Sequence, residues 1–161
     1  MNWDEFAEAA PRIAAVFVRR HAAVGNLCFL GTNRPDGFPR VSPMEPRMFE
    51  GDLVLAGMPG TAKFRDLDAD PRFTLHTATV DTHVSDGDAK VWGTVQHDPD
   101  TARHERFAED LFATTGFDLR GRTFDRFLVA RLVGAASVEI DEGLVITTWR
   151  AGGEERRIRK D

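Results

Sequence analysis

Short strand-like runs separated by tight turns dominate this sequence, and their alternation constrains the fold more than any other feature. Asn33–Gly37 contains the turn signal Pro-Asp-Gly, and Glu50–Asp52 and Asp141–Gly143 are two further short polar reversals. Glycine, proline, asparagine and aspartate supply the backbone conformations that such turns need. The runs that are typical of strands cover residues 27–30, 38–49, 53–56, 73–80, 89–96, 124–140 and 144–150.

Most of these runs are joined by connections of hairpin length, so we expect antiparallel neighbours. The alternation of strand and helix that marks a parallel, doubly wound sheet is missing. The sequence therefore predicts a mainly β fold with flanking helices, in which six or seven mostly antiparallel strands form a small barrel. Pro43 and Pro46 interrupt the run 38–49, which predicts an edge, a bulge or a bend there.

Three helical segments flank the predicted strands. Residues 2–23 form an amphipathic segment with an apolar stripe at steps of three and four, and Pro11 divides or kinks it. A short helix is expected from Thr61 to Asp68, and a longer one is opened by Asp98-Pro99 and closed by Gly116. The residues of the first stripe are Trp3, Phe6, Ala10, Ile13 and Phe17.

Length and composition are typical of one ordinary domain that needs no disulfide bond or metal ion to be stable. The chain has 161 residues, of which 42 % are hydrophobic and 29 % charged, so we expect one domain over 1–161 with its barrel at 25–150. A net charge of −5 disfavours a nucleic-acid partner. The apolar runs are too short to cross a membrane, and the acidic N-terminus is unlike a signal peptide. A single cysteine, Cys28, suits a reducing compartment, so a cytoplasmic protein is expected.

The segment from Gly57 to Phe64 is the strongest candidate for a ligand site. Only three of the 21 basic residues are lysines, and one of these, Lys63, falls in the first turn of a predicted helix. A cation is unfavourable there unless an anion is bound, because the helix dipole already places positive charge at that end. Thr61 adds a hydroxyl group at the helix start. The alternative is a capped surface helix with a solvated lysine. The local sequence features favour neither the ligand site nor this alternative over the other.

Three segments together resemble the pyridoxamine 5′-phosphate oxidase-like superfamily. They are Gly37-Phe38-Pro39-Arg40-Val41-Ser42-Pro43, Leu53-Val54-Leu55-Ala56-Gly57, and the string from Thr61 to Arg72 with the pattern Thr-x-Lys-x-x-x-Leu-x-x-Asp-Pro-Arg. The strand at Trp92-Gly93-Thr94-Val95 fits as well. The resemblance implies a split β-barrel that forms a homodimer. It also implies two cofactor sites at the subunit interface that hold FMN, or the deazaflavin F420, by its phosphate.

The resemblance also assigns residues to the cofactor. It implies that Thr61 and Lys63 bind the phosphate beside the glycine loop at Gly57, and that a polar residue near Asp88 reaches the ring of the partner's cofactor. Ala62 stands where the family has an arginine before the lysine. The strand expected beside the ring system falls on Arg40, Val41, Ser42 and Pro43.

The predicted function is that of an FMN-dependent oxidoreductase acting on a small molecule. The cofactor would carry the hydride chemistry, which suits a sequence without a recognisable triad or metal-ligand cluster, and no catalytic residue is assigned. The family's substrate-gripping histidine is missing after Trp149-Arg150, so a reaction other than vitamin B6 oxidation is expected. The alternatives are an F420-dependent reductase and a dimer that holds flavin or haem without turnover. The basic end, 156–160, is interpreted as a solvated tail.

Overall fold

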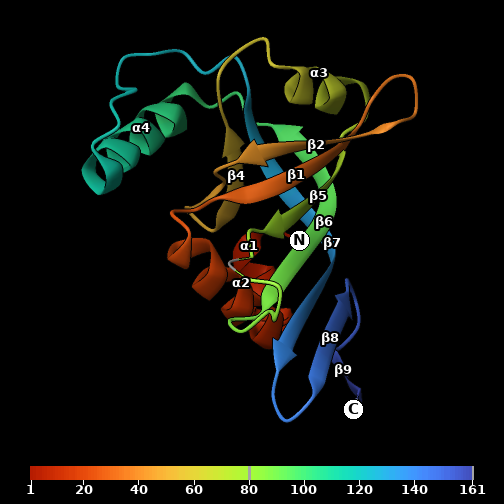
Figure 1. Ribbon diagram of the computed structural model, residues 1–161. Coiled ribbons are helices and arrows are strands. Elements are labelled where there is room, and N and C mark those ends of the chain that lie inside the picture. The colour runs from red at the N-terminus through yellow and green to blue at the C-terminus, as the bar shows by residue number, and fades with distance from the viewer. Residues whose placement is uncertain (80, 161) are drawn as a thin grey trace.

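The computed structural model describes residues 1–79 and 81–160 of the chain. Within them the chain forms four helices and nine strands (Figure 1). The helices are α1 (Trp3–Ala9), α2 (Pro11–Ala23), α3 (Ala62–Ala69) and α4 (Thr101–Thr115). The strands are β1 (Cys28–Asn33), β2 (Pro39–Met44), β3 (Arg47–Phe49), β4 (Asp52–Ala56), β5 (Arg72–Thr77), β6 (Asp88–His97), β7 (Phe127–Ile140), β8 (Leu144–Arg150) and β9 (Arg156–Lys160).

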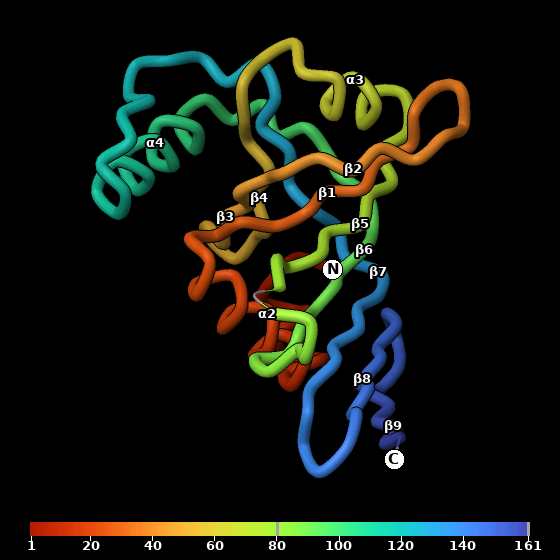
Figure 2. The backbone as a smooth tube through the Cα atoms, viewed as in Figure 1, coloured from red at the N-terminus to blue at the C-terminus, as the bar shows by residue number. Residues whose placement is uncertain are grey.

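All strand pairs in the described residues are antiparallel and belong to one strongly curved sheet. The order along its main path is β2-β1-β5-β6-β7-β4-β3, and β8 and β9 extend from β7. The long strand β7 makes this possible, because one end pairs with β4 and the other with β8 while β6 runs beside it. The tube view shows the hairpin of β8 and β9 projecting away from the barrel (Figure 2). The predicted mainly β split barrel with flanking helices is confirmed.

The number of strands exceeds the expected six or seven for two reasons. The run 38–49 was predicted as one strand but forms β2 and β3, because the chain turns a corner at residues 45–46. The segment 156–160 was interpreted as a solvated tail, yet it pairs with β8 and becomes β9. Its side chains are nevertheless all exposed. The strand expected over 73–80 ends at Thr77, and residue 80 lies outside the described residues.

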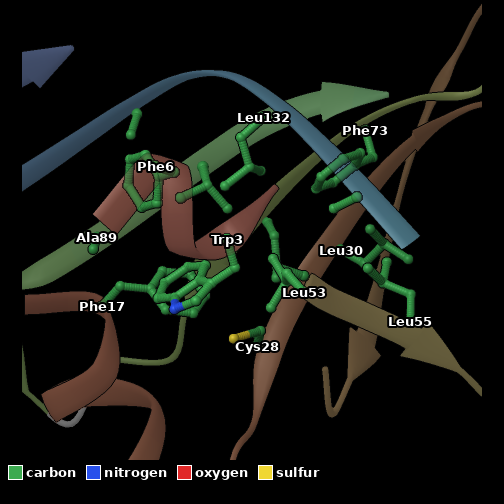
Figure 3. Packing of buried hydrophobic residues seen from close by; sticks show 14 of the residues in the cluster. Trp3, Phe6, Phe17, Cys28, Leu30, Leu53, Leu55, Phe73, Ala89 and Leu132 are labelled. Atoms are coloured by element: carbon green, nitrogen blue, oxygen red, sulfur yellow. The ribbon is translucent and has the colours of Figure 1, made fainter. Parts of the chain in front are cut away.

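The helices α1 and α2 close one end of the barrel and complete its core. Pro11 occupies the first position of α2, where its missing N–H costs nothing, so it separates the two helices as predicted. Trp3, Phe6 and Phe17 enter the cluster from the helices and meet Cys28 and the leucines of the strands (Figure 3). The ring of Phe6 also packs edge-on against Trp149 of β8, with centroids 5.3 Å apart.

The helix α4 lies to the side of the barrel and covers a second, smaller core (Figure 1). It was expected to open at Asp98-Pro99, but its N-cap is Asp100, whose side chain accepts from the amides of Ala102 and Arg103. Gly116 ends the helix as predicted, in the left-handed conformation with φ 75°. Among the described residues, no helix combines the length and apolarity needed to span a bilayer.

Candidate functional site

The start of α3 presents a buried hydroxyl group that has no partner among the residues that the structure describes. Thr61 is the N-cap of this helix in the extended conformation that favours capping, yet its side chain makes no capping bond. Its Oγ1 atom is inaccessible to solvent and makes no hydrogen bond within the described residues. Burying an unpaired hydroxyl costs free energy, and the first amides of a helix also lack intrahelical partners. This helix end is therefore suited to an acceptor group that comes from outside the chain.

A hollow of about 220 Å³ lies beside Thr61. Arg65, one turn further along α3, lines it and donates from Nη1 to the carbonyl group of Gly60 (2.5 Å). Arg126 lines the hollow from the far side and pairs with Asp68 at 2.8 Å. The carboxylates of Asp68 and Asp125 line the hollow as well, and Asp68 balances the charge of Arg126. Arg65 makes no ion pair within the described residues, so the side of the hollow at the helix start, with Thr61 and Arg65, is the one that suits an anion.

Lys63 points away from this hollow toward strand β2. Its ammonium group donates to the carbonyl group of Pro43 (2.8 Å). Burial lowers the pKa of Lys63, while the nearby carboxylate of Glu45 acts in the opposite direction. The two residues expected to bind phosphate together therefore face different sides of the helix start. An ammonium group has three donors, so this contact leaves two for other acceptors.

Arg40 is tied to α3 through a buried carboxylate. Its Nε donates to Asp66 Oδ2 at 2.6 Å, and the hydroxyl group of Thr32 donates to the same oxygen at 2.8 Å. Burial by itself would raise the pKa of Asp66, but the hydrogen bonds from Arg40 and Thr32 outweigh it and hold the pKa below its usual value. Arg40 thus fixes β2 against α3, which makes it a positioning residue for the candidate site.

The other residues of β2 present alternate sides of the strand. Val41 is 71 % exposed, Pro43 is also exposed, and Ser42 between them is half-buried. Val41 and Pro43 belong to a sheet surface whose side chains leave the barrel, which we call the outer face. From β2 to β6 the outer face comprises Val41, Pro43, Phe29, Thr74, His76, Lys90 and Trp92.

Gly57 has a packing role in this chain. A Cβ atom placed on it would lie 2.9 Å from the ring of Phe64, so the missing side chain lets the α3 aromatic ring approach the backbone of the glycine loop. That approach seats the start of α3 against the end of β4. Gly57 therefore shapes the loop before Thr61 through its own lack of a side chain.

Asp88 is not brought close to the other predicted cofactor-binding residues of the same chain. It begins β6, which is separated from β2 by β1 and β5, so about three strand spacings, roughly 14 Å, lie between them. Lys90 donates to its carboxylate at 2.9 Å, and Nε2 of His76 lies 3.9 Å from the same oxygen. These three side chains form a small charged group on the outer face.

Sequence reasoning missed the two arginines of the hollow. The position of Arg65 could have been predicted from the sequence, because residues four apart on a helix share a face and Thr61 and Arg65 have this spacing. Arg126 comes from a loop more than sixty residues away in sequence, and only the fold brings it to α3. Cys28 is buried, and burial raises its pKa to about 12, as suits a small core residue. Among the residues that the structure describes, no cluster of three His, Cys, Asp or Glu could hold a metal ion.

Comparison with known proteins decides the family. A family model described as pyridoxamine 5′-phosphate oxidase matches residues 23–133, well over half of the chain. The chain belongs to this family. The matched segment includes β2, the glycine loop, α3 and β6, and thus every residue for which the sequence predicted a cofactor contact. No curated protein matches the chain.

Solved structures share the fold at low sequence identity. A pyridoxamine 5′-phosphate oxidase-related, FMN-binding protein from Nostoc punctiforme is 13 % identical with a TM-score of 0.66, covering 94 % of this chain and 95 % of that one. An F420 reductase is 22 % identical with a TM-score of 0.52, covering 68 % and 87 %. A heme binding protein from Mycobacterium smegmatis is 17 % identical with a TM-score of 0.56, covering 90 % and 57 %.

Proposed function

We propose that this chain is an FMN-dependent oxidoreductase that works as a homodimer on a small-molecule substrate. The observation that carries the proposal is the buried hydroxyl of Thr61 at the start of α3, which has no partner among the described residues and lies beside a hollow that Arg65 also lines. A phosphate group would accept from this hydroxyl, from the first amides of the helix and from Arg65, and would remove the cost of the unpaired group.

In this proposal the residues around α3 have different roles in binding the cofactor. Thr61 and Arg65 would bind the phosphate, and Lys63 adds positive charge while it holds β2 through the Pro43 carbonyl. Val41, Ser42 and Pro43 would then lie beside the ring system, with Arg40 fixing their strand against Asp66. Bound FMN supplies the capacity to accept and donate a hydride. The chain itself binds the phosphate, orients the ring and limits access of water.

The homodimer would bring the charged group of the outer face to the site. Asp88, Lys90 and His76 lie on β5 and β6, whereas the proposed cofactor contacts of the same chain lie on β2 and at the start of α3. In a twofold dimer formed through the outer face, these side chains of one protomer would approach the ring held by the other. Asp88 would then contribute a polar contact to the ring of its partner's cofactor.

The related structures supply two alternatives to FMN. F420 carries a phosphate that the same cradle would accept, and an F420 reductase shares the fold. A heme binding protein shares it as well, which keeps a non-catalytic binding dimer among the outcomes of the test. Vitamin B6 oxidation is not proposed, because the sequence lacks the family's histidine after Arg150.

The absorption spectrum of the purified protein, before and after adding FMN, F420 or haem, tests the proposal. We expect a flavin spectrum that becomes bleached by a reductant and recovers with an electron acceptor. FMN titration of the wild type and of Thr61→Val then tests the cradle, with affinity expected to fall by about tenfold. Binding of F420 or haem in place of FMN would replace the proposed cofactor. Bound FMN that no acceptor reoxidises would favour the non-catalytic dimer.

A further inference from the structure

The charged group of Asp88, Lys90 and His76 contains a histidine in a distinctive setting. His76 lies on β5, with Phe29 of β1 and Lys90 of β6 as its register partners. Its side chain is 35 % exposed, and its Nε2 lies 3.9 Å from an oxygen of Asp88. Within residues 1–79 and 81–160, no other histidine pairs with a carboxylate in this way. His76 therefore differs from the other histidines of the described chain.

A backbone contact fixes the tautomer of the His76 ring. Nδ1 lies 2.6 Å from the carbonyl oxygen of Thr77. A carbonyl oxygen can only accept a hydrogen bond, so Nδ1 carries the proton and donates it. The neutral ring therefore has a bare Nε2 with a free lone pair. The buried rings of His21 and His104 are the opposite case, because each places Nε2 at 2.7 Å from a carbonyl oxygen.

Nε2 of His76 faces a carboxylate that can only accept hydrogen bonds. The oxygen of Asp88 nearest to it already accepts from Lys90 Nζ at 2.9 Å. Two acceptors do not bond to each other, so the lone pair of Nε2 has no donor among the described residues. A second proton on Nε2 produces an imidazolium ion, which the negative charge of Asp88 attracts. His76 can thus take up and release a proton at Nε2 while Nδ1 holds the ring in place.

We propose that His76 of one protomer is the proton donor for a reaction at the cofactor held by its partner. The inference rests on the proposed function, in which the homodimer brings this charged group to the partner's ring. The reductant is a reduced nicotinamide, and the substrate is an acceptor that takes up a proton together with a hydride, such as a quinone.

The proton balances this reaction. Transfer of a hydride from the reduced cofactor converts a quinone into a hydroquinone anion. The Nε2–H bond of His76 then breaks as an O–H bond forms on that anion. The ring is left neutral with a bare Nε2, and it recovers its proton from water when the product leaves the site.

NMR of the intact protein with isotope-labelled histidine tests the geometry without any reaction. In the neutral ring of His76 we expect a proton on Nδ1 and a bare Nε2, and the opposite tautomer in His104. The signals that disappear in His76→Asn are those of His76. Addition of FMN should shift them and leave those of His104, which stacks on Phe127 in the smaller core, unchanged. A neutral His76 protonated on Nε2, or FMN binding without a shift, would overturn the proposal.

Reoxidation of the FMN-loaded protein, after reduction with dithionite, tests the proton transfer. Menadione is a quinone that takes up protons with its electrons, whereas ferricyanide takes up electrons alone. His76→Asn keeps an amide N–H for the Thr77 carbonyl group but has no base in place of Nε2. In stopped-flow experiments this variant should react about a hundredfold more slowly with menadione and less than about twofold more slowly with ferricyanide. His97→Asn, at the exposed end of β6, is the control and should alter neither rate.

The outcomes separate this inference from the proposed function. A protein that binds no FMN contradicts both. Bound FMN that is reoxidised equally fast in wild type and His76→Asn, or is slowed equally with both acceptors, overturns the inference alone. A wild type that ferricyanide reoxidises and menadione does not has the same consequence. Melting curves show whether His76→Asn folds, and His76→Gln, which also lacks a base, replaces it if it does not.

Discussion

Thr61 is the residue whose substitution separates stability from binding. Its buried hydroxyl has no partner in the part of the chain that the structure describes, so Thr61→Val should leave the free energy of unfolding of the free protein unchanged or raise it by up to about 1 kcal/mol. The same change should weaken cofactor binding, because a donor to the phosphate is lost. Urea unfolding and calorimetric titration measure the two effects. Thr61→Ser keeps the hydroxyl group and should retain the affinity; equal losses in both variants would remove the hydroxyl from the site.

Asp66 is the residue through which acid should weaken the site. Its pKa is held below the ordinary value of 3.8, so the ionised carboxylate stabilises the fold above that pH, and this stability is lost as the pH falls through the lowered pKa. At neutral pH, Asp66→Asn should cost about 1.5–3 kcal/mol, the range for hydrogen bonds to a charged group. The difference from wild type should shrink toward pH 3 in urea unfolding experiments.

Asp68 is the matched control on the same helix. It pairs with Arg126, but both side chains are about two-fifths exposed, so Asp68→Asn should cost less than about 1 kcal/mol. If Asp66→Asn and Asp68→Asn proved equally mild, the buried contact to Arg40 would not be what fixes β2 against α3.

The sequence allowed some positions of the candidate site residues to be predicted, but not the contacts of their side chains. Thr61 was placed correctly at a helix start, because the N-cap preference is local in sequence. The direction of Lys63 was not predictable, since it depends on a β2 carbonyl group twenty residues away. The contribution of Arg126 was not predictable for the same reason, because only the fold brings this residue to α3. The barrel determines which distant segments come into contact, and local patterns in a single sequence do not predict these contacts.

At the scale of the elements, a hydrogen bond between distant segments takes the place of a missing helix cap. The N-cap of α2 is Ala10, which cannot cap the helix, and Glu155 accepts from the amide of Ile13 at 3.0 Å in its place. Glu155→Ala should therefore lower the free energy of unfolding by about 0.5–2 kcal/mol. Glu154→Ala is the control, and it should change stability by less than about 0.5 kcal/mol. Equal effects in urea unfolding would argue against the cap.

Most elements followed from local patterns, and the exceptions share a cause. Turn residues located the hairpins, and Pro11 and Gly116 marked helix limits where the structure has them. The basic segment 156–160 looked like a tail because its side chains are polar and exposed, but its backbone pairs with β8. An exposed edge strand buries no apolar side chain, so hydrophobic periodicity gives no signal for it.

At the scale of the whole molecule, the outer face is where a second copy of the chain would pack. Phe29 is 43 % exposed and Val41 is 71 % exposed, and both lie at the end of the sheet where β2 is an edge strand. Exposed apolar side chains on a sheet edge invite association, which proteins otherwise prevent with charges. We therefore expect light scattering to give the mass of a dimer at micromolar concentration.

Substitutions that place a charge on this surface test whether the dimer completes the cofactor site. Val41→Glu should shift the protein toward monomer and weaken FMN binding together, because each proposed site takes contacts from both protomers. Val18→Glu is the control: Val18 is 43 % exposed on α2, away from the sheet, so its charge should leave both properties unchanged. A Val41→Glu monomer that binds FMN as tightly as the wild type would show that one chain holds the cofactor alone. Asp88, which begins β6, would then have no part in the cofactor site.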